Sequence, residues 1–217
     1  KPDIAIGTGG YVSGPILRKA AKMNIPILLH ESNAYPGVTV KMLAKHAHAV
    51  MIAQQVARKH LAKNARVLVT GNPLRSEFFS VDRATARSRL GLDSRPVVLS
   101  YGGSLGAARI NEVMTKVLVH SAKQGKIQHI HAAGSLGYHD MIKNLQELGV
   151  GRDNSDIRVR EYIDDMAYCM AAADIVICRC GAMTISELPA AAKPAILIPS
   201  PNVAENHQYH NAMALVH

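Results

Sequence analysis

The sequence predicts an α/β protein made of two doubly wound domains in tandem. Short apolar runs rich in Val and Ile alternate with amphipathic stretches along the 217 residues, a pattern typical of parallel sheets covered by helices. A glycine-rich turn follows the first expected strand of each half, GTGGYVSG at 7–14 and YGGSLGA at 101–107. A polar break between Gly71 and Pro96 separates the halves. We therefore predict two Rossmann-like domains.

In the first half, the apolar runs predict strands and the stretches between them predict helices. The expected strands are residues 3–6, 25–29, 49–52 and 67–69. The expected helices are residues 14–23, 37–45 and 54–63.

The second half repeats this scheme after an arginine-rich polar helix at 82–90. The expected strands are residues 97–100, 127–132, 157–159, 174–178 and 194–198. The expected helices are residues 107–123, 139–148, 164–173, 184–192 and 205–216. We place the boundary near residues 75–81, which gives domains of 1–78 and 79–217. The chain has no initiator Met and both ends interrupt the pattern, so we expect a piece of a longer protein with both domains truncated.

The composition excludes several classes of protein. With 48% hydrophobic and 19% charged residues, the chain is too apolar to be disordered. Aromatic residues make up 4% and Trp is absent, which argues against a base-stacking nucleic-acid surface, so we expect no nucleic-acid partner. No apolar run approaches the ~20 residues of a membrane span. Cys169, Cys178 and Cys180 lack the spacing of a disulfide framework or zinc site, and we expect buried thiols in the cytoplasm.

The net charge of +9 is concentrated at one end of the chain. Residues 1–75 hold 11 Lys and Arg and only two acids, Asp3 and Glu31, whereas residues 76–217 are balanced. Such an excess favours an anionic partner of the first domain.

Both glycine turns are candidate phosphate sites. Glycines let the backbone approach an anion, and the following helix offers free N–H groups. The candidate residues are Gly9, Gly10 and Ser13 in the first turn, and Gly102, Gly103 and Ser104 in the second. Neither turn matches GxGxxG or a P-loop, which disfavours NAD. The alternative is that these glycines only allow tight turns.

Seven motifs together are more specific than the alternation of expected strands and helices. They are GTGGYVSGP (7–15), LLHESNAYPG (28–37), VTGNPLR (69–75), YGGSLGAARIN (101–111), EYIDDM (161–166), CRCGAMTISEL (178–188) and NHQYHNA (206–212). In this order they resemble the family of UDP-N-acetylglucosamine–N-acetylmuramyl-(pentapeptide) pyrophosphoryl-undecaprenol N-acetylglucosamine transferases, the MurG family, over essentially the whole chain.

The resemblance implies a GT-B fold and an inverting transfer of GlcNAc from UDP-GlcNAc to the muramyl 4-hydroxyl of lipid I, which gives lipid II. It places the protein in peptidoglycan synthesis, with cell-wall biogenesis, cell shape and cell division. It also implies a peripheral position on the cytoplasmic face of the bacterial membrane, and cell-wall synthesis and division proteins as partners. The first domain would take the lipid-linked acceptor, and the second would take UDP-GlcNAc.

Matching the motifs residue by residue gives an expected UDP-GlcNAc site. Glu187 would bind the ribose, Ser104 the diphosphate, Ile163 the uracil through its backbone, and Arg75 the nucleotide or phosphate. The remaining expected contacts are Asn33, Ala182, Met183, Thr184 and Gln208. Leu105 replaces a Gln found in many relatives. From the residues alone, Glu187 could instead cap its helix, Arg75 could be a solvated loop residue, and Ile163 could be a core residue.

On the acceptor side, the expected catalytic residues are Glu31 and Tyr11. Glu31 would act as general base on the acceptor hydroxyl or orient it, and the alternative is a Glu satisfied by nearby Lys and Arg. A histidine that the family carries upstream of Lys1 is a rival base. We also expect the basic residues of the first two helices to face anionic lipid; they are Arg18, Lys19, Lys22, Lys41 and Lys45.

We predict no cofactor and no obligatory metal. There is no DxD triplet, and the pair His207 and His210 lacks a third ligand. The chain has no recognition motif of a basic nucleic-acid-binding protein. It also has neither the GxGxxG turn nor the Tyr-x-x-x-Lys pair that a nucleotide-sugar epimerase or dehydrogenase would need. Another GT-B UDP-sugar transferase, or a fragment that binds nucleotide without activity, stays open as an alternative.

Overall fold

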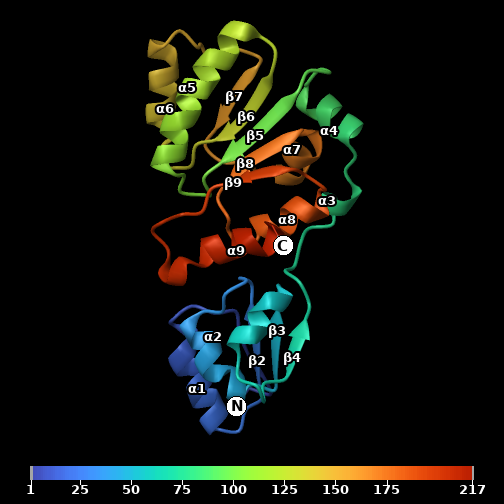
Figure 1. The fold of residues 1–217 in the computed structure, drawn as a ribbon, viewed down its shortest axis with the longest axis vertical. Helices are drawn as coiled ribbons and strands as arrows, with labels where there is room; N and C mark the ends of the chain where they lie inside the picture. The colour runs from blue at the N-terminus through green and yellow to red at the C-terminus, as the bar shows by residue number, and fades with distance from the viewer. Residues whose placement is uncertain (1, 217) are drawn as a thin grey trace. The chain divides into compact units, whose positions relative to one another are not determined.

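A computed structural model of the chain describes residues 2–216 and contains two sheets in which every neighbouring pair of strands is parallel (Figure 1). The first sheet has the order β1-β2-β3-β4 and the second has the order β7-β6-β5-β8-β9. Helices connect the strands in both. The prediction of an α/β fold with parallel sheets is therefore confirmed.

The chain divides into two compact units, and each contains one of the sheets. The first consists of Lys1–Pro73, Cys180–Ser186 and Pro199–His217, and the second of Leu74–Arg179 and Glu187–Ile198. These units are discontinuous in sequence, whereas the bounds 1–78 and 79–217 are continuous. The assignment of those bounds to acceptor and donor domains stays a prediction.

The first sheet consists of β1 (Ala5–Gly7), β2 (Ile27–Glu31), β3 (Ala49–Ile52) and β4 (Val67–Val69). Its connections include α1 (Ser13–Lys22), α2 (Val38–Leu43) and the short 3-10 segments η1 (Ala44–His46) and η2 (Gln55–His60). The helix expected at 54–63 is thus a 3-10 helix.

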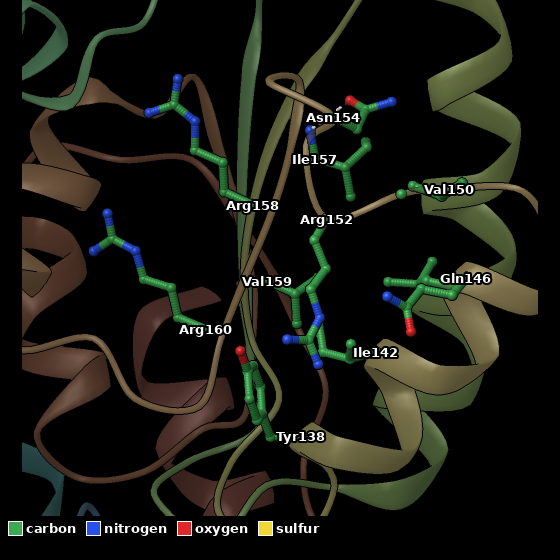
Figure 2. A pocket seen from close by; sticks show the side chains of 12 residues that line it. Tyr138, Ile142, Gln146, Val150, Arg152, Asn154, Ile157, Arg158, Val159 and Arg160 are labelled. Atoms are coloured by element: carbon green, nitrogen blue, oxygen red, sulfur yellow. Dashed lines mark hydrogen bonds between the residues drawn. The ribbon is translucent and has the colours of Figure 1, made fainter.

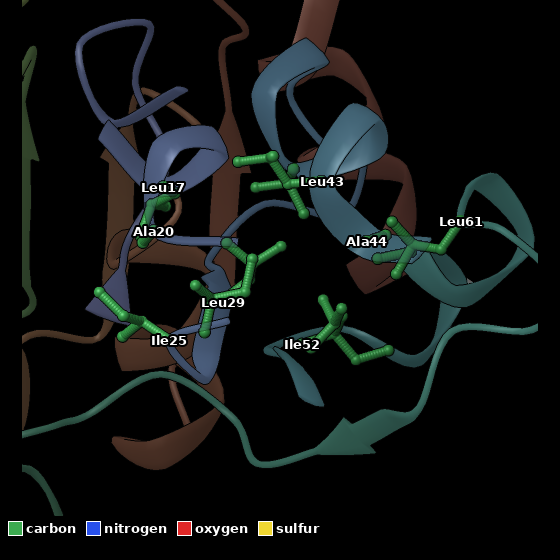
Figure 3. Packing of buried hydrophobic residues seen from close by; sticks show 12 residues of the cluster. Leu17, Ala20, Ile25, Leu29, Leu43, Ala44, Ile52 and Leu61 are labelled. Carbon is green, nitrogen blue, oxygen red and sulfur yellow. The ribbon is translucent and has the colours of Figure 1, made fainter. Parts of the chain in front are cut away.

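The core of the first unit lies between this sheet and α1 and α2 (Figure 3). Leu17 on α1 and Leu43 on α2 pack with Leu29 and Ile52 on the strands. Gly7, where β1 ends, allows the closest approach, because a Cβ there would lie 2.2 Å from Leu17 Cδ1. This packing holds the first glycine turn at the carboxyl end of the sheet.

The second sheet consists of β5 (Val97–Tyr101), β6 (Gln128–Ala132), β7 (Ile157–Arg160), β8 (Ile175–Cys178) and β9 (Ala195–Leu197). Figure 1 shows α5 (Ala108–Gln124) and α6 (Tyr138–Glu147) together on one side of it, and α4 (Arg83–Leu90) and α7 (Met166–Ala172) on the other. Doubly wound sheets are covered in this way.

The remaining helices are short or lie near the end of the chain. They are α3 (Glu77–Ser80), α8 (Thr184–Ala190), η3 (Ala204–Asn206) and α9 (His207–Val216). The single turn α3 was not expected. The last helix begins at His207 rather than residue 205, because Glu205 and Asn206 have left-handed φ angles of 52° and 50°.

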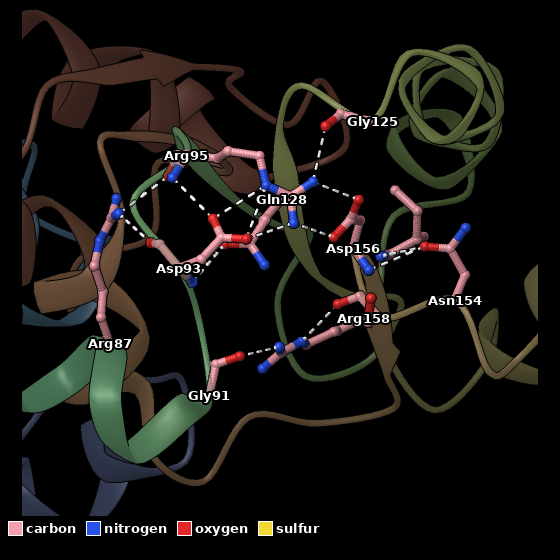
Figure 4. A network of polar contacts seen from close by, with 11 residues as sticks. Arg87, Gly91, Asp93, Arg95, Gly125, Gln128, Asn154, Asp156 and Arg158 are labelled. Atoms are coloured by element: carbon pink, nitrogen blue, oxygen red, sulfur yellow. Dashed lines mark hydrogen bonds and ion pairs between the residues drawn. The ribbon is translucent and has the colours of Figure 1, made fainter.

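One buried arginine fastens the segment that leads into β5 (Figure 4). Arg87 on α4 donates to the carbonyls of Ala172, Asp93 and Arg95 and to the carboxylate of Asp174. Arg95 in turn pairs with Asp93 and Asp156. These contacts lie at the amino ends of the strands and leave the carboxyl ends free.

A buried polar chain joins β5, β6 and α5 in the same unit. Ser100 Oγ lies 2.8 Å from His131 Nδ1, and His131 Nε2 lies 3.1 Å from Asn111 Oδ1. Because Asn111 Nδ2 donates to the Ala133 carbonyl, its Oδ1 must accept, so His131 carries its proton on Nε2 and Ser100 donates to Nδ1.

Acid should destabilise this unit. Burial lowers the pKa of His131 and His129 to about 4, from an ordinary value of 6.5. The stability that the folded protein has with both imidazoles neutral is therefore fully present above pH 6.5 and is lost as pH falls toward 4. At pH 5 the loss is roughly 2 kcal/mol per histidine. Urea denaturation at pH 7 and pH 5 measures it.

The variant His131→Gln should lose less stability between these pH values than the unchanged protein. His139→Gln, exposed on α6, is the control. Equal losses in His131→Gln and the unchanged protein would contradict the assignment of the acid sensitivity to this buried imidazole.

Candidate functional site

The predicted residues of the first unit gather at the carboxyl ends of β1 and β2. They line a pocket of about 280 Å³, in which Gly9, Gly10, Tyr11, Glu31 and Asn33 face a common space. Ala204, Glu205 and His207 also line this pocket. Open parallel sheets bind ligands at this edge.

The first glycine turn depends on left-handed backbone and on one hydroxyl. Gly9 and Gly10 have φ angles of 92° and 75°, which glycine adopts without the cost of a Cβ. Ser13 Oγ lies 2.8 Å from the Gly9 carbonyl and 2.9 Å from the Gly10 carbonyl. The Ser13 hydroxyl therefore closes the turn, while Tyr11 is 88% exposed.

Glu31 is buried, with 5% of its surface exposed, and it accepts three hydrogen bonds. Its Oε1 accepts from the backbone N–H and the side-chain amide of Asn33, at 2.9 and 3.1 Å, and its Oε2 accepts from Gly37 N at 2.9 Å. N–H groups of its own loop, rather than Lys or Arg side chains, satisfy this carboxylate.

Two asparagines that sequence reasoning did not single out fasten this region. Asn211, completely buried on α9, accepts from Ala34 N and donates to Asn33 Oδ1 and to the Cys180 carbonyl. Asn72 Nδ2 lies within 3.1 Å of the carbonyls of Ser32 and Ala182 and of Ser186 Oγ. Both lie in quoted motifs, GNP and NHQYHNA, but their partners are distant in sequence.

Gln208 and its neighbour also have defined partners. Gln208 Oε1 accepts from Cys180 N and Ser200 N, which leaves its amide hydrogens as the groups suited to a ligand. His207 Nδ1 donates to the Ala204 carbonyl at 2.9 Å. Together these contacts bring Gln208, Ala182 and Asn33 into one hydrogen-bonded region of the first unit.

In the second unit, the predicted phosphate turn lies between β5 and α5. A Cβ at Gly102 would lie 2.6 Å from Ala107 N, and one at Gly106 would lie 2.1 Å from the Ala133 carbonyl. Gly103 and Ser104 lie between these two close approaches. No side chain caps α5, so its first N–H groups are directed toward the turn without a side-chain acceptor.

Glu187 is a half-buried carboxylate in the second unit. Burial raises its pKa, and the positive charge of Arg75 opposes that rise. Among the hydrogen bonds of residues 2–216, the Glu187 backbone carbonyl accepts from Ala191 N but the side-chain carboxylate accepts none, so the capping alternative finds no support. Its unfilled lone pairs suit a pair of hydroxyl donors.

Arg75 contacts in space the segment that contains Ile163. Arg75 donates to the Asp164 carbonyl at 3.4 Å and lines a pocket of about 330 Å³ with Asp165 and Tyr168. Ile163 is 3% exposed, so its side chain belongs to the core and only its backbone could meet a base.

Another pocket contains none of the predicted residues. About 300 Å³ in volume, it lies between α6 and β7 and is lined by both apolar and polar residues, among them Ile142, Gln146 and Arg152 (Figure 2). Arg158 and Arg160 extend to the other side of β7, where they contact the Gly91 carbonyl and Asp165.

The cysteines are all buried, as expected, and burial raises the pKa of Cys169 to about 12. Within residues 2–216, no group of three or more His, Cys, Asp or Glu side chains is arranged to hold a metal ion. In the same part of the chain, no helix has the length and apolar character needed to cross a bilayer.

Comparison with protein families identifies the chain. The glycosyltransferase family 28 C-terminal domain matches residues 97–217, and the family 28 N-terminal domain matches residues 1–52. The chain belongs to glycosyltransferase family 28.

Curated relatives in family 28 support this membership. The chain is 46% identical to the UDP-N-acetylglucosamine–N-acetylmuramyl-(pentapeptide) pyrophosphoryl-undecaprenol N-acetylglucosamine transferase of Acetivibrio thermocellus, over 99% of this chain and 58% of that protein. It is 43% identical to the protein of the same name from Caldanaerobacter subterraneus, with the same coverage. The chain thus spans 58% of the length of these relatives.

Solved structures agree with the expected GT-B class. The crystal structure of Acinetobacter baumannii MurG is 30% identical, with a TM-score of 0.72 over 99% of this chain and 57% of that chain. A UDP-GlcNAc 2-epimerase from Neisseria meningitidis is 13% identical, with a TM-score of 0.65 over 99% of this chain and 62% of its own. The second likeness shows the fold alone.

The family 28 glycine turn after β5 should be sensitive at Gly106 and tolerant at Gly103. Both have left-handed φ angles, 88° and 99°, but a Cβ at Gly103 meets nothing within 4 Å. Gly106→Ala should therefore destabilise by roughly 3 kcal/mol, against about 1 kcal/mol for the control Gly103→Ala. Thermal or urea denaturation measures the difference, and equal effects would refute the close approach to Ala133.

Proposed function

We propose that this protein takes part in peptidoglycan synthesis as an inverting glycosyltransferase. It transfers GlcNAc from UDP-GlcNAc to the muramyl 4-hydroxyl of lipid I and gives lipid II. The observation that carries the proposal is that relatives with 38% to 46% identity over 99% of this chain all bear the transferase name. The epimerase neighbours match in fold at far lower identity.

The donor side is supported by the chemistry of the second unit. The N–H groups of the turn at Gly102–Ser104, together with the start of α5, suit the diphosphate. Glu187 suits the ribose hydroxyls, and Ile163 offers its backbone to uracil. The proposed UDP-GlcNAc contacts also include Ala182–Thr184, Asn33 and Gln208.

The chemical step requires stabilisation of the negative charge on the leaving group and an acceptor for the proton of the attacking hydroxyl. As the bond between the anomeric carbon and the diphosphate breaks, negative charge develops on the leaving UDP. The turn N–H groups, the α5 dipole and Arg75 suit that charge. The acceptor hydroxyl loses a proton in the same displacement, and Tyr11 and Glu31 lie in the pocket proposed for the acceptor. The proposal includes no cofactor or metal.

The acceptor's location suggests a peripheral position on the cytoplasmic face of the membrane. Exposed Arg18, Lys19 and Lys22 line a hollow of about 610 Å³ with apolar Pro15 and Met42. Basic residues beside apolar ones suit an anionic lipid surface. We also propose cell-wall synthesis and division proteins as partners at this position.

Lys41 is a poorer lipid contact than the sequence suggested. It forms an ion pair with Glu205 at 2.8 Å and lies over the Tyr35 ring. The hydrogen bond to Glu205 raises its pKa. The proposed lipid surface therefore consists of Arg18, Lys19 and Lys22; Lys45 is exposed as well.

Titration calorimetry tests the donor assignment. The protein should bind UDP and UDP-GlcNAc but not NAD. Glu187→Gln should weaken UDP about 10- to 100-fold, since hydrogen bonds to a charged group contribute about 1.5–3 kcal/mol. Glu147→Gln, exposed on α6, is the matched control. Absence of UDP binding would count against the transferase, and UDP binding without transfer to lipid I would favour another UDP-sugar transferase or a nucleotide-binding fragment.

Vesicle co-sedimentation tests the membrane assignment. Replacing Arg18, Lys19 and Lys22 together by Gln should weaken binding to anionic vesicles roughly 100-fold, at about 1 kcal/mol per residue. Replacing exposed Lys116 and Lys143 by Gln should have little effect. Binding that is equal on neutral vesicles, or indifferent to salt, would contradict an electrostatic attachment.

A further inference from the structure

The carboxylate of Glu31 has little capacity left to take a proton. An ionised carboxylate offers about four lone-pair sites, and three N–H donors from Asn33 and Gly37 already occupy it. A general base needs an open lone pair within hydrogen-bond reach of the hydroxyl. Glu31 instead has both oxygens engaged and 5% of its surface exposed.

These three donors all come from the loop that follows β2. Asn33 N and Gly37 N lie two and six residues after Glu31, so the carboxylate closes the loop onto the end of its own strand. Gly37 directly precedes α2, which no side chain caps. Glu31 thereby fixes both the loop and the start of the next helix.

The orientation of the Asn33 amide follows from backbone groups. Asn211 must present Oδ1 to Ala34 N and Nδ2 to the Cys180 carbonyl. Its Nδ2 also donates to Asn33 Oδ1, and Asn33 Nδ2 donates to Glu31. A flipped Asn33 amide would set donor against donor and acceptor against acceptor, so a single orientation remains. One N–H of Asn33 is then free for the pocket that it lines.

We propose that Glu31 is a positioning residue: it holds Asn33 so that the remaining amide N–H meets a hydroxyl of the donor sugar, and it does not accept the proton of the acceptor. The inference rests on the proposed function, because it takes the nucleotide sugar as the ligand. Tyr11, or a group beyond these residues, then serves the proton transfer.

The test compares Glu31→Gln, Glu31→Ala and Asn33→Ala in the complete protein, with Glu147→Gln as control. Glutamine keeps an acceptor oxygen for Asn33 but loses the charge. Glu31→Gln should raise the dissociation constant of UDP-GlcNAc a few-fold, leave that of UDP unchanged and keep the acid limb of the kcat profile. Glu31→Ala and Asn33→Ala should raise the dissociation constant of UDP-GlcNAc further. In the Asn33→Ala background, Glu31→Gln should raise this constant by less than a further twofold.

Two results would overturn the proposal. One is a loss of kcat by 100-fold or more in Glu31→Gln together with loss of the acid limb, which is the behaviour of a general base. The other concerns the ratio of UDP-GlcNAc affinity to UDP affinity. If the change of this ratio in the double variant equalled the product of the changes in Glu31→Gln and Asn33→Ala, the two residues would act independently.

Hydrogen exchange separates this inference from the proposed function. If the unchanged protein bound no UDP-GlcNAc, the transferase assignment would fail on its own. The backbone amides of Asn33 and Gly37 should still exchange faster in Glu31→Ala than in the Glu147→Gln control. Unchanged exchange at both amides would overturn the positioning role. Should Glu31→Ala not fold, faster exchange of Gly37 in Glu31→Gln gives the same comparison.

Discussion

Every neighbouring pair of strands in both sheets is parallel, so each connection must return the chain along the outside of the sheet before the next strand begins. Within each sheet, all carboxyl ends therefore lie at one edge, and each is followed by a loop that enters a helix. In the first sheet, the glycine turn after β1 and the loop after β2 occupy this edge; in the second sheet, the glycine turn after β5 occupies the corresponding edge. Residues far apart in sequence become neighbours there without long loops.

Buried polar groups at this edge are satisfied by backbone atoms rather than by opposite charges. Glu31 receives N–H groups of its own loop, and Asn211 pairs with a backbone N–H and a carbonyl. Such partners cannot rotate away as a lysine could, so they define the orientation of the side chains that they hold. The fold alone does not specify the reaction, because epimerases share it.

Strand positions were predictable because Val- and Ile-rich runs have few alternatives, and all nine expected strands occur. The single turn α3 and the 3-10 character of η2 were missed, since neither leaves a periodic pattern of sufficient length. Glu31 was recognised as a site residue, but its donors depend on how the loop turns back. The contact between Asn33 and Asn211 joins residues 178 positions apart, which no local pattern encodes.

The hydrogen bonds of Arg87 limit the substitutions that the chain tolerates at this position. Its planar guanidinium reaches three carbonyls and one carboxylate from its three nitrogens, with Nη1 donating to two of the carbonyls. Lysine carries the same charge on a single nitrogen and has no fork with which to span those acceptors. Exchange between the two basic residues is harmless on a solvated helix, but at this position it would leave buried carbonyls without donors. The shape of the side chain at this position therefore matters as much as its charge.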